Sequence, residues 1–185
     1  MPREAPTPFG IAIAPPAPPY LGLHAELSAH LAIHRFVAGD TSGACALARE
    51  AQVTIVPPAV LHRSLNIRVP LAVIIVLSSG SDPDVLHAEL QALHDAARRY
   101  GWPAGSAETV ALYGSFLAVA REDWGLAARL LAAGGSAAWG HPGKGHLAFH
   151  FADRIRAVLG PEIFRTQYEA GRAMPLGDAV AVALS

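Results

Sequence analysis

The chain has 185 residues, enough for one domain or a short array of repeats, and 52% of them are hydrophobic while only 16% are charged. Fourteen lysines and arginines against 15 aspartates and glutamates give a net charge of −1, without a basic stripe to neutralise a row of phosphates, so we expect no nucleic-acid binding by this chain alone. The longest strongly apolar run, 69–77, contains Pro70 and is far shorter than the roughly 20 residues of a membrane span, so we expect no membrane partner.

The first 20 residues form a proline-rich segment. Residues 14–20 are APPAPPY, and proline lacks an amide donor and clashes with the preceding helical turn, so we expect 1–20 to be a disordered leader. A polyproline ligand for another domain is the alternative. The segment lacks the apolar core of a secretory signal, and the single cysteine, Cys45, agrees with a reducing compartment. We therefore expect a cytoplasmic protein.

Three aspartates divide the rest of the chain at regular intervals. Asp40, Asp82 and Asp123 are separated by 42 and 41 residues, and each comes just before a segment whose apolar residues recur at helical spacing. An aspartate in this position can accept a hydrogen bond from an unpaired amide of the first helical turn. We therefore predict that each aspartate caps the second helix of a helical pair.

The predicted pairs cover about 23–53, 59–100 and 107–133. The second pair is the least regular, because Pro70 would kink or split its first helix and the run 69–77 is β-branched enough for a buried strand. A lone strand without a partner of similar character could not satisfy its backbone hydrogen bonds, so we prefer the helix. The sequence alone therefore leaves the conformation of residues 56–82 undecided.

Glycines and prolines also mark predicted helix boundaries in the carboxyl-terminal part. Glycines at 140, 143 and 145 indicate a hinge, followed by a helix over about 146–159. Pro161 suits the first position of the next helix, which Gly171 ends, and a short helix follows Pro175. We predict an all-α fold over residues 21–185: a helical-hairpin array of about three pairs with a C-terminal helical cap at about 146–184.

The spacing of small residues resembles that of tetratricopeptide repeats. In both Asp40 with Ala44 and Asp123 with Ala127, three residues separate the aspartate from a small residue that lets neighbouring helices approach closely. The middle repeat departs from this pattern with Leu86, and the interval exceeds the roughly 34 residues of the standard motif. Longer helices or wider linkers are therefore expected.

A second resemblance covers roughly the last 80 residues. The segments WGLAARLLAA (124–133), VLGPEIF (158–164) and GRAMPL (171–176), followed by Ala179-Val180 and Ala183-Leu184, are similar in kind and order to the tail of large bacterial signal-transduction ATPases. These transcriptional regulators are often of the LuxR type or joined to a cyclase-like domain. The resemblance implies the sensor and scaffold part of a regulator, with the hypothesis that this chain is a truncated copy.

Motifs for nucleotide binding and nucleophilic catalysis fail in detail. The stretch 140–146 has Gly145 after Lys144, where a phosphate loop needs serine or threonine for magnesium. Ser115 has Tyr113 two residues before it, where the nucleophile elbow of hydrolases has glycine, so we interpret it as a small packing residue in a helix. We predict no enzyme activity, no catalytic residue and no cofactor.

Histidines offer the other possible chemistry. His30 with His34, and His146 with His150, are four residues apart, so each pair would share a helix face and could supply two metal ligands. A complete site needs a third ligand, and the nearby carboxylates of Glu26 and Asp153 have no motif to support them. We interpret these histidines as surface or half-buried residues and predict no metal.

The first helical pair carries the predicted interaction surface. Leu27, Leu31 and Phe36 give its first helix more apolar area than one partner helix can cover, which favours docking of a protein or peptide, or self-association. We interpret the scattered arginines, Arg172 included, as solvated or capping residues. The predicted function is a non-enzymatic interaction or effector-sensing module; the alternative is a small enzyme or histidine-based metal protein with an unrecognised site.

Overall fold

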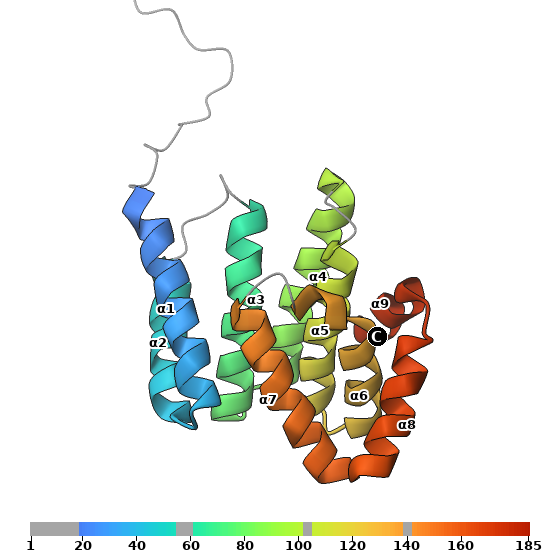
Figure 1. The fold of residues 1–185 in the computed structure, drawn as a ribbon. Coiled ribbons are helices and arrows are strands. Elements are labelled where there is room, and N and C mark those ends of the chain that lie inside the picture. The colour runs from blue at the N-terminus through green and yellow to red at the C-terminus, as the bar shows by residue number, and fades with distance from the viewer. Residues whose placement is uncertain (1–18, 55–60, 102–104, 139–141) are drawn as a thin grey trace, which may run out of the picture.

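The computed structural model describes residues 19–54, 61–101, 105–138 and 142–185, and within these ranges every regular element is a helix (Figure 1). The all-α prediction is therefore confirmed for the described residues. None of the described helices is long and apolar enough to cross a bilayer. The α-helices are α1 (Pro19–Val37), α2 (Thr41–Thr54), α3 (Leu61–Ser79), α4 (Pro83–Tyr100), α5 (Gly105–Ala120), α6 (Trp124–Ala133), α7 (Pro142–Leu159), α8 (Pro161–Arg172) and α9 (Leu176–Ala183), with a 3₁₀ turn η1 (Gly135–Ala138) after α6.

The three aspartates cap helices as their sequence positions predicted. In each case a side-chain oxygen accepts a hydrogen bond from a backbone amide of the first turn of α2, α4 or α6, so one otherwise unpaired donor is satisfied. The bonds run from Gly43 to Asp40, from Asp84 to Asp82 and from Leu126 to Asp123, each 2.9 Å long.

Helix α3 resolves the open stretch of the sequence. It is one helix that contains Pro70, and residues 69–76 are all buried in it, so the strand alternative is wrong and the helix is not split. The run is apolar throughout because it is buried in a helix that packs against α1, α2, α4 and α5. Residues 55–60 lie outside the described ranges.

Two predicted boundaries are corrected by the structure. Helix α1 begins at Pro19, so the expected leader is two residues too long, and 1–18 lie outside the described residues. Helix α7 begins at Pro142, so the expected hinge is wrong at Gly143 and Gly145, which are inside the helix. Proline lacks only an amide that the first turn leaves unpaired, and it can open a helix in both places.

Helices α1 to α6 pack in chain order, each against the next, but the carboxyl-terminal helices fold back over this series. Helix α7 contacts α1, α5, α6 and α8, while α8 packs on α6 and α9 on α5 (Figure 1). In a simple repeat array each unit contacts only its neighbours, so the contact between α7 and α1 is a departure from that arrangement.

An aromatic cluster joins the helices that α7 brings together. The ring of Phe151 on α7 is 4.5 Å from that of Phe116 on α5 and 6.0 Å from that of Phe36 on α1, measured between centroids. All three side chains are buried. The contact with Phe36 links segments more than a hundred residues apart, and the two contacts together fix α7 across the front of the molecule in Figure 1.

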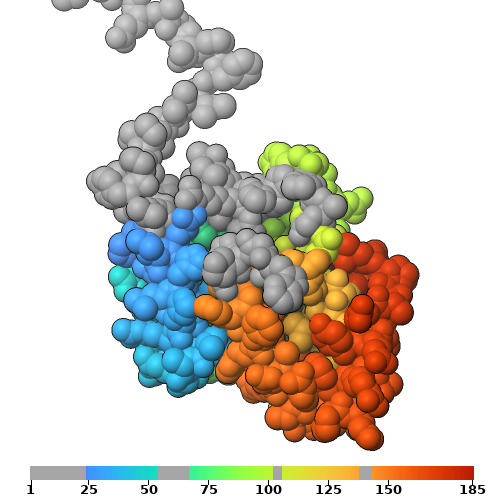
Figure 2. Space-filling view, in the orientation of Figure 1, coloured from blue at the N-terminus to red at the C-terminus, as the bar shows by residue number. Residues whose placement is uncertain are grey.

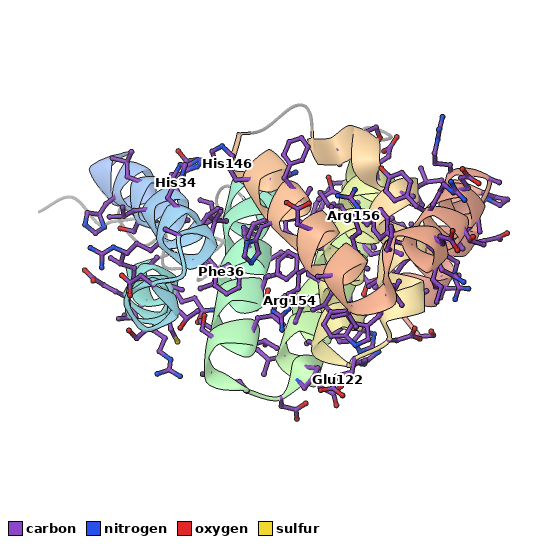
Figure 3. The ribbon with its side chains drawn as sticks, turned by 60° about the horizontal axis from the view of Figure 1, so that its bottom comes forward. His34, Phe36, Glu122, His146, Arg154 and Arg156 are labelled. Atoms are coloured by element: carbon purple, nitrogen blue, oxygen red, sulfur yellow. The ribbon has the colours of Figure 1, made fainter. Side chains whose placement is uncertain are left out.

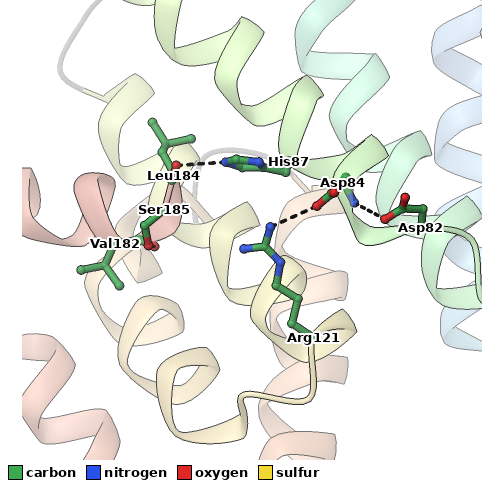
Figure 4. Close-up of polar contacts among 7 residues, drawn as sticks. All are labelled: Asp82, Asp84, His87, Arg121, Val182, Leu184 and Ser185. Carbon is green, nitrogen blue, oxygen red and sulfur yellow. Dashed lines mark hydrogen bonds and ion pairs between the residues drawn. The ribbon is translucent and has the colours of Figure 1, made fainter.

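The last helix is held against α4 and α5. The His87 ring donates a hydrogen bond to the carbonyl oxygen of Leu184 at 3.0 Å, and next to it Arg121 pairs with Asp84 at 3.3 Å (Figure 4). Gly114 of α5 lies so close to Ala183 that an added Cβ atom would be 2.5 Å from the alanine Cβ. Small residues therefore allow α9 to pack closely on α5.

Candidate functional site

A half-open groove of about 450 Å³ lies between α6, η1, α7 and α8. Its apolar walls come mainly from three helices, and its polar groups come from η1 and α8. Figure 2 shows the orange surface of α7 next to the red surface of α8, the two helices that border it. The lining residues are Leu131, Ala132, Gly135, Ser136, Gly145, Ala148, Phe149, Ala152, Tyr168 and Arg172.

Small side chains on α7 create the space. Gly145, Ala148 and Ala152 recur at intervals of three and four residues, so they share one face of the helix, and that face lines the groove. Phe149 stands on the same face and is 60% exposed. The result is an apolar floor with an exposed aromatic ring beside it, a combination typical of binding grooves.

Close backbone contact places α8 against α6. Gly171 is buried, and a Cβ atom added to it would lie 2.1 Å from the backbone oxygen of Arg129. One turn earlier on α8, Gln167 accepts a hydrogen bond of 3.1 Å from the guanidinium of Arg129. These contacts set the position of Tyr168 and Arg172, which project from the same helix into the groove.

The side-chain polar groups of the groove have no partners among the described residues. Neither the Ser136 hydroxyl, the Tyr168 hydroxyl nor the Arg172 guanidinium makes a hydrogen bond or ion pair with the part of the chain that the structure describes, although the Tyr168 ring packs on Phe164 at 5.5 Å. All three can donate hydrogen bonds. The groove therefore presents donors to a ligand without first having to break internal bonds.

The predicted interaction surface is only partly at the surface. Leu27 and Leu31 are 61% and 47% exposed on α1. Phe36 is only 4% exposed, so the prediction that it belongs to the surface is wrong. Its ring packs against Phe151 and lies 5.5 Å from the ring of His150. Phe36 is covered because α7 returns to α1, a contact that the local pattern of the first helix does not contain.

The two histidine pairs meet at the same crossing of α1 and α7. The rings of His34 and His146 are in edge contact, with centroids 4.8 Å apart (Figure 3). The His30 ring lies against α7 near Gly143. Within the described residues, no three histidine, cysteine, aspartate or glutamate side chains are arranged to hold a metal ion. The crossing is thus a seam of imidazoles that pack on each other and on Phe36.

The seam also holds one histidine with a shifted pKa. Partial burial lowers the pKa of His150 below its usual range, the nearby Arg154 cation lowers it further, and Asp153 opposes the shift. The ring of His150 contacts both Phe36 and Phe151. The neutral imidazole is therefore the form that suits this position.

Lys144, considered in the sequence for nucleotide binding, and Ser115, considered for catalysis, both have structural partners. Lys144 is half-buried, with its Nζ atom 3.3 Å from the Thr109 hydroxyl and 6.0 Å from the centre of the Tyr113 ring, and burial lowers its pKa. Ser115 is fully buried and donates to the Leu112 carbonyl at 2.6 Å, as expected of a packing residue in a helix. Neither residue lines the groove.

Sequence reasoning did not find the groove. Arg172 is exposed, in agreement with its interpretation as a solvated or capping residue, but the sequence does not indicate that it lines a groove with Phe149 and Tyr168, because a groove between three helices has no local motif. The available signal was the spacing of Gly145, Ala148 and Ala152, which marks a helix face of small residues. No family model matches this chain, and no curated protein or solved structure is significantly similar to it.

Proposed function

We propose that this protein is a non-enzymatic interaction module that receives a segment of a partner protein in the groove between α6, α7 and α8. The observation that carries the proposal is the combination of an apolar floor with polar groups that have no partner among the described residues. Ser136 and Arg172 are exposed and Tyr168 is half-buried, so all three donors can be reached by a ligand that lies on the apolar floor.

The resemblance of the carboxyl-terminal segments to the tail of bacterial regulators supports the same proposal. In such a protein the helical repeats act as the sensor and scaffold, and a partner or effector binds between helices. A tetratricopeptide-like arrangement would supply the close helix packing that Ala44 and Ala127 provide, since both are fully buried. The role of this chain would be to recognise a partner in signal transduction.

A groove-filling variant tests the proposal. A phage-displayed library of random peptides is selected on the wild-type protein and then compared on Ala148→Phe and Ala157→Phe. Ala148 lines the groove, while Ala157 is an exposed residue of the same helix that does not line it. We expect selected peptides to bind the wild type and the Ala157 variant, and to lose at least tenfold in affinity for the Ala148 variant.

Circular dichroism spectra of the two variants serve as the folding control. If no selected peptide distinguishes the Ala148 variant from the Ala157 variant while both remain folded, the groove does not receive a peptide and the proposal is wrong.

A further inference from the structure

The charge of the groove limits the kind of partner that it fits. Among the described residues that line the groove, the exposed Arg172 is the only one with a full charge, and none carries a carboxylate. Glu169, three positions before Arg172 on α8, is exposed and makes no ion pair with it in the described structure. The guanidinium is therefore an uncompensated cation at the edge of an apolar surface.

The geometry of the donors narrows the ligand further. Tyr168 and Arg172 are four residues apart on α8, so the hydroxyl and the guanidinium project from the same face. A guanidinium is planar and has paired donors that match the two oxygens of a carboxylate. A hydroxyl beside it can donate a further bond to the same group. Three donors without an acceptor-only group favour an anion over a cation.

We infer that the groove binds a partner segment in which an aspartate or glutamate side chain stands next to a large apolar residue. The carboxylate contacts Arg172 and the Tyr168 hydroxyl, and the apolar side chain lies on Leu131, Ala148 and Ala152. This inference rests on the proposed function and adds to it the chemistry of the recognised segment. Because the groove is half-open, the segment can enter and leave it as a continuous chain.

A pair of small probes tests the carboxylate separately from peptide binding. 4-Phenylbutanoate carries a ring and a carboxylate, and 4-phenylbutanamide is its neutral counterpart of nearly the same shape. Each is titrated into ¹⁵N-labelled protein and followed by NMR. We expect the acid to shift amide signals around the groove and to bind about tenfold more tightly than the amide, the difference that a charged hydrogen bond at a partly hydrated site supplies.

Arg172→Gln should remove the preference for the acid and leave the weak binding of the amide unchanged. Arg99→Gln is the matched control, since Arg99 is an exposed arginine of α4 outside the groove. Added sodium chloride should weaken the binding of the acid and leave the amide unaffected, which gives a measurement that needs no variant.

The outcomes separate the two proposals. Equal affinity for acid and amide, or a preference that survives Arg172→Gln, would overturn the carboxylate inference while peptide binding to the groove could still stand. Tight binding of the acid together with a library that yields no groove-dependent peptide would show instead that the site takes a small free acid. In that case both the proposed function and the peptide segment are wrong.

Discussion

Replacing Gly171 with alanine should force α8 away from α6. The added methyl group would lie 2.1 Å from the backbone oxygen of Arg129 and 2.6 Å from its Cα atom, far inside ordinary contact distance. Both are backbone atoms, so no side chain can rotate to make room. The two helices must separate, and Phe164 on α8, now 6% exposed, would lose contact with the core.

The magnitude follows from two opposing effects. Overpacking of a close helix contact costs about 3 kcal/mol when the surroundings cannot yield, the upper end of the usual range. Alanine is about 1 kcal/mol better than glycine inside a helix. The expected net loss is about 2 kcal/mol of the free energy of unfolding.

Urea denaturation followed by circular dichroism measures the loss, and Gly177→Ala is the matched control. Gly177 is also in a helix, α9, but an added Cβ would meet nothing within 4 Å. This variant should be unchanged or more stable by up to about 1 kcal/mol. If Gly171→Ala unfolds at the same urea concentration as the wild type, α8 does not lie against the backbone of α6, and the groove that depends on this contact is incorrect.

Two further predictions concern the other end of the molecule. The lowered pKa of His150 means that this residue binds a proton more readily in the unfolded chain, so the free energy of unfolding should fall as the pH decreases from 7 through the usual histidine range. His150→Gln should reduce this pH dependence, measured by urea titrations at several pH values. The same pH dependence in the variant and the wild type would contradict the prediction. Leu27 and Leu31 are exposed, so replacing both with glutamate should change the free energy of unfolding by less than about 0.5 kcal/mol per site. The double variant should also weaken any self-association, measured by sedimentation velocity. A variant that unfolds would place the two leucines in a core instead.

Much of the secondary structure could be predicted from the sequence because its signals are local. Asp40, Asp82 and Asp123 cap helices through bonds to amides two or three residues away, so the sequence contains both partners. Pro83 and Pro161 begin helices for a similar reason, since the missing amide would be unpaired there in any case. The all-α class follows from these boundaries and from the helical spacing of apolar residues between them.

The tertiary structure decided which side chains are buried and which residues form the groove. The sequence alone shows that Phe36 is apolar and on a helix, but whether it is exposed depends on α7, which returns from more than a hundred residues away to cover it. The histidine pairs meet for the same reason. The groove is further still from any local pattern, because its floor and its free donors come from α6, η1, α7 and α8 together. Local hydrogen bonds determine where helices start and stop, whereas burial and the pairing of polar groups depend on which distant surfaces pack together.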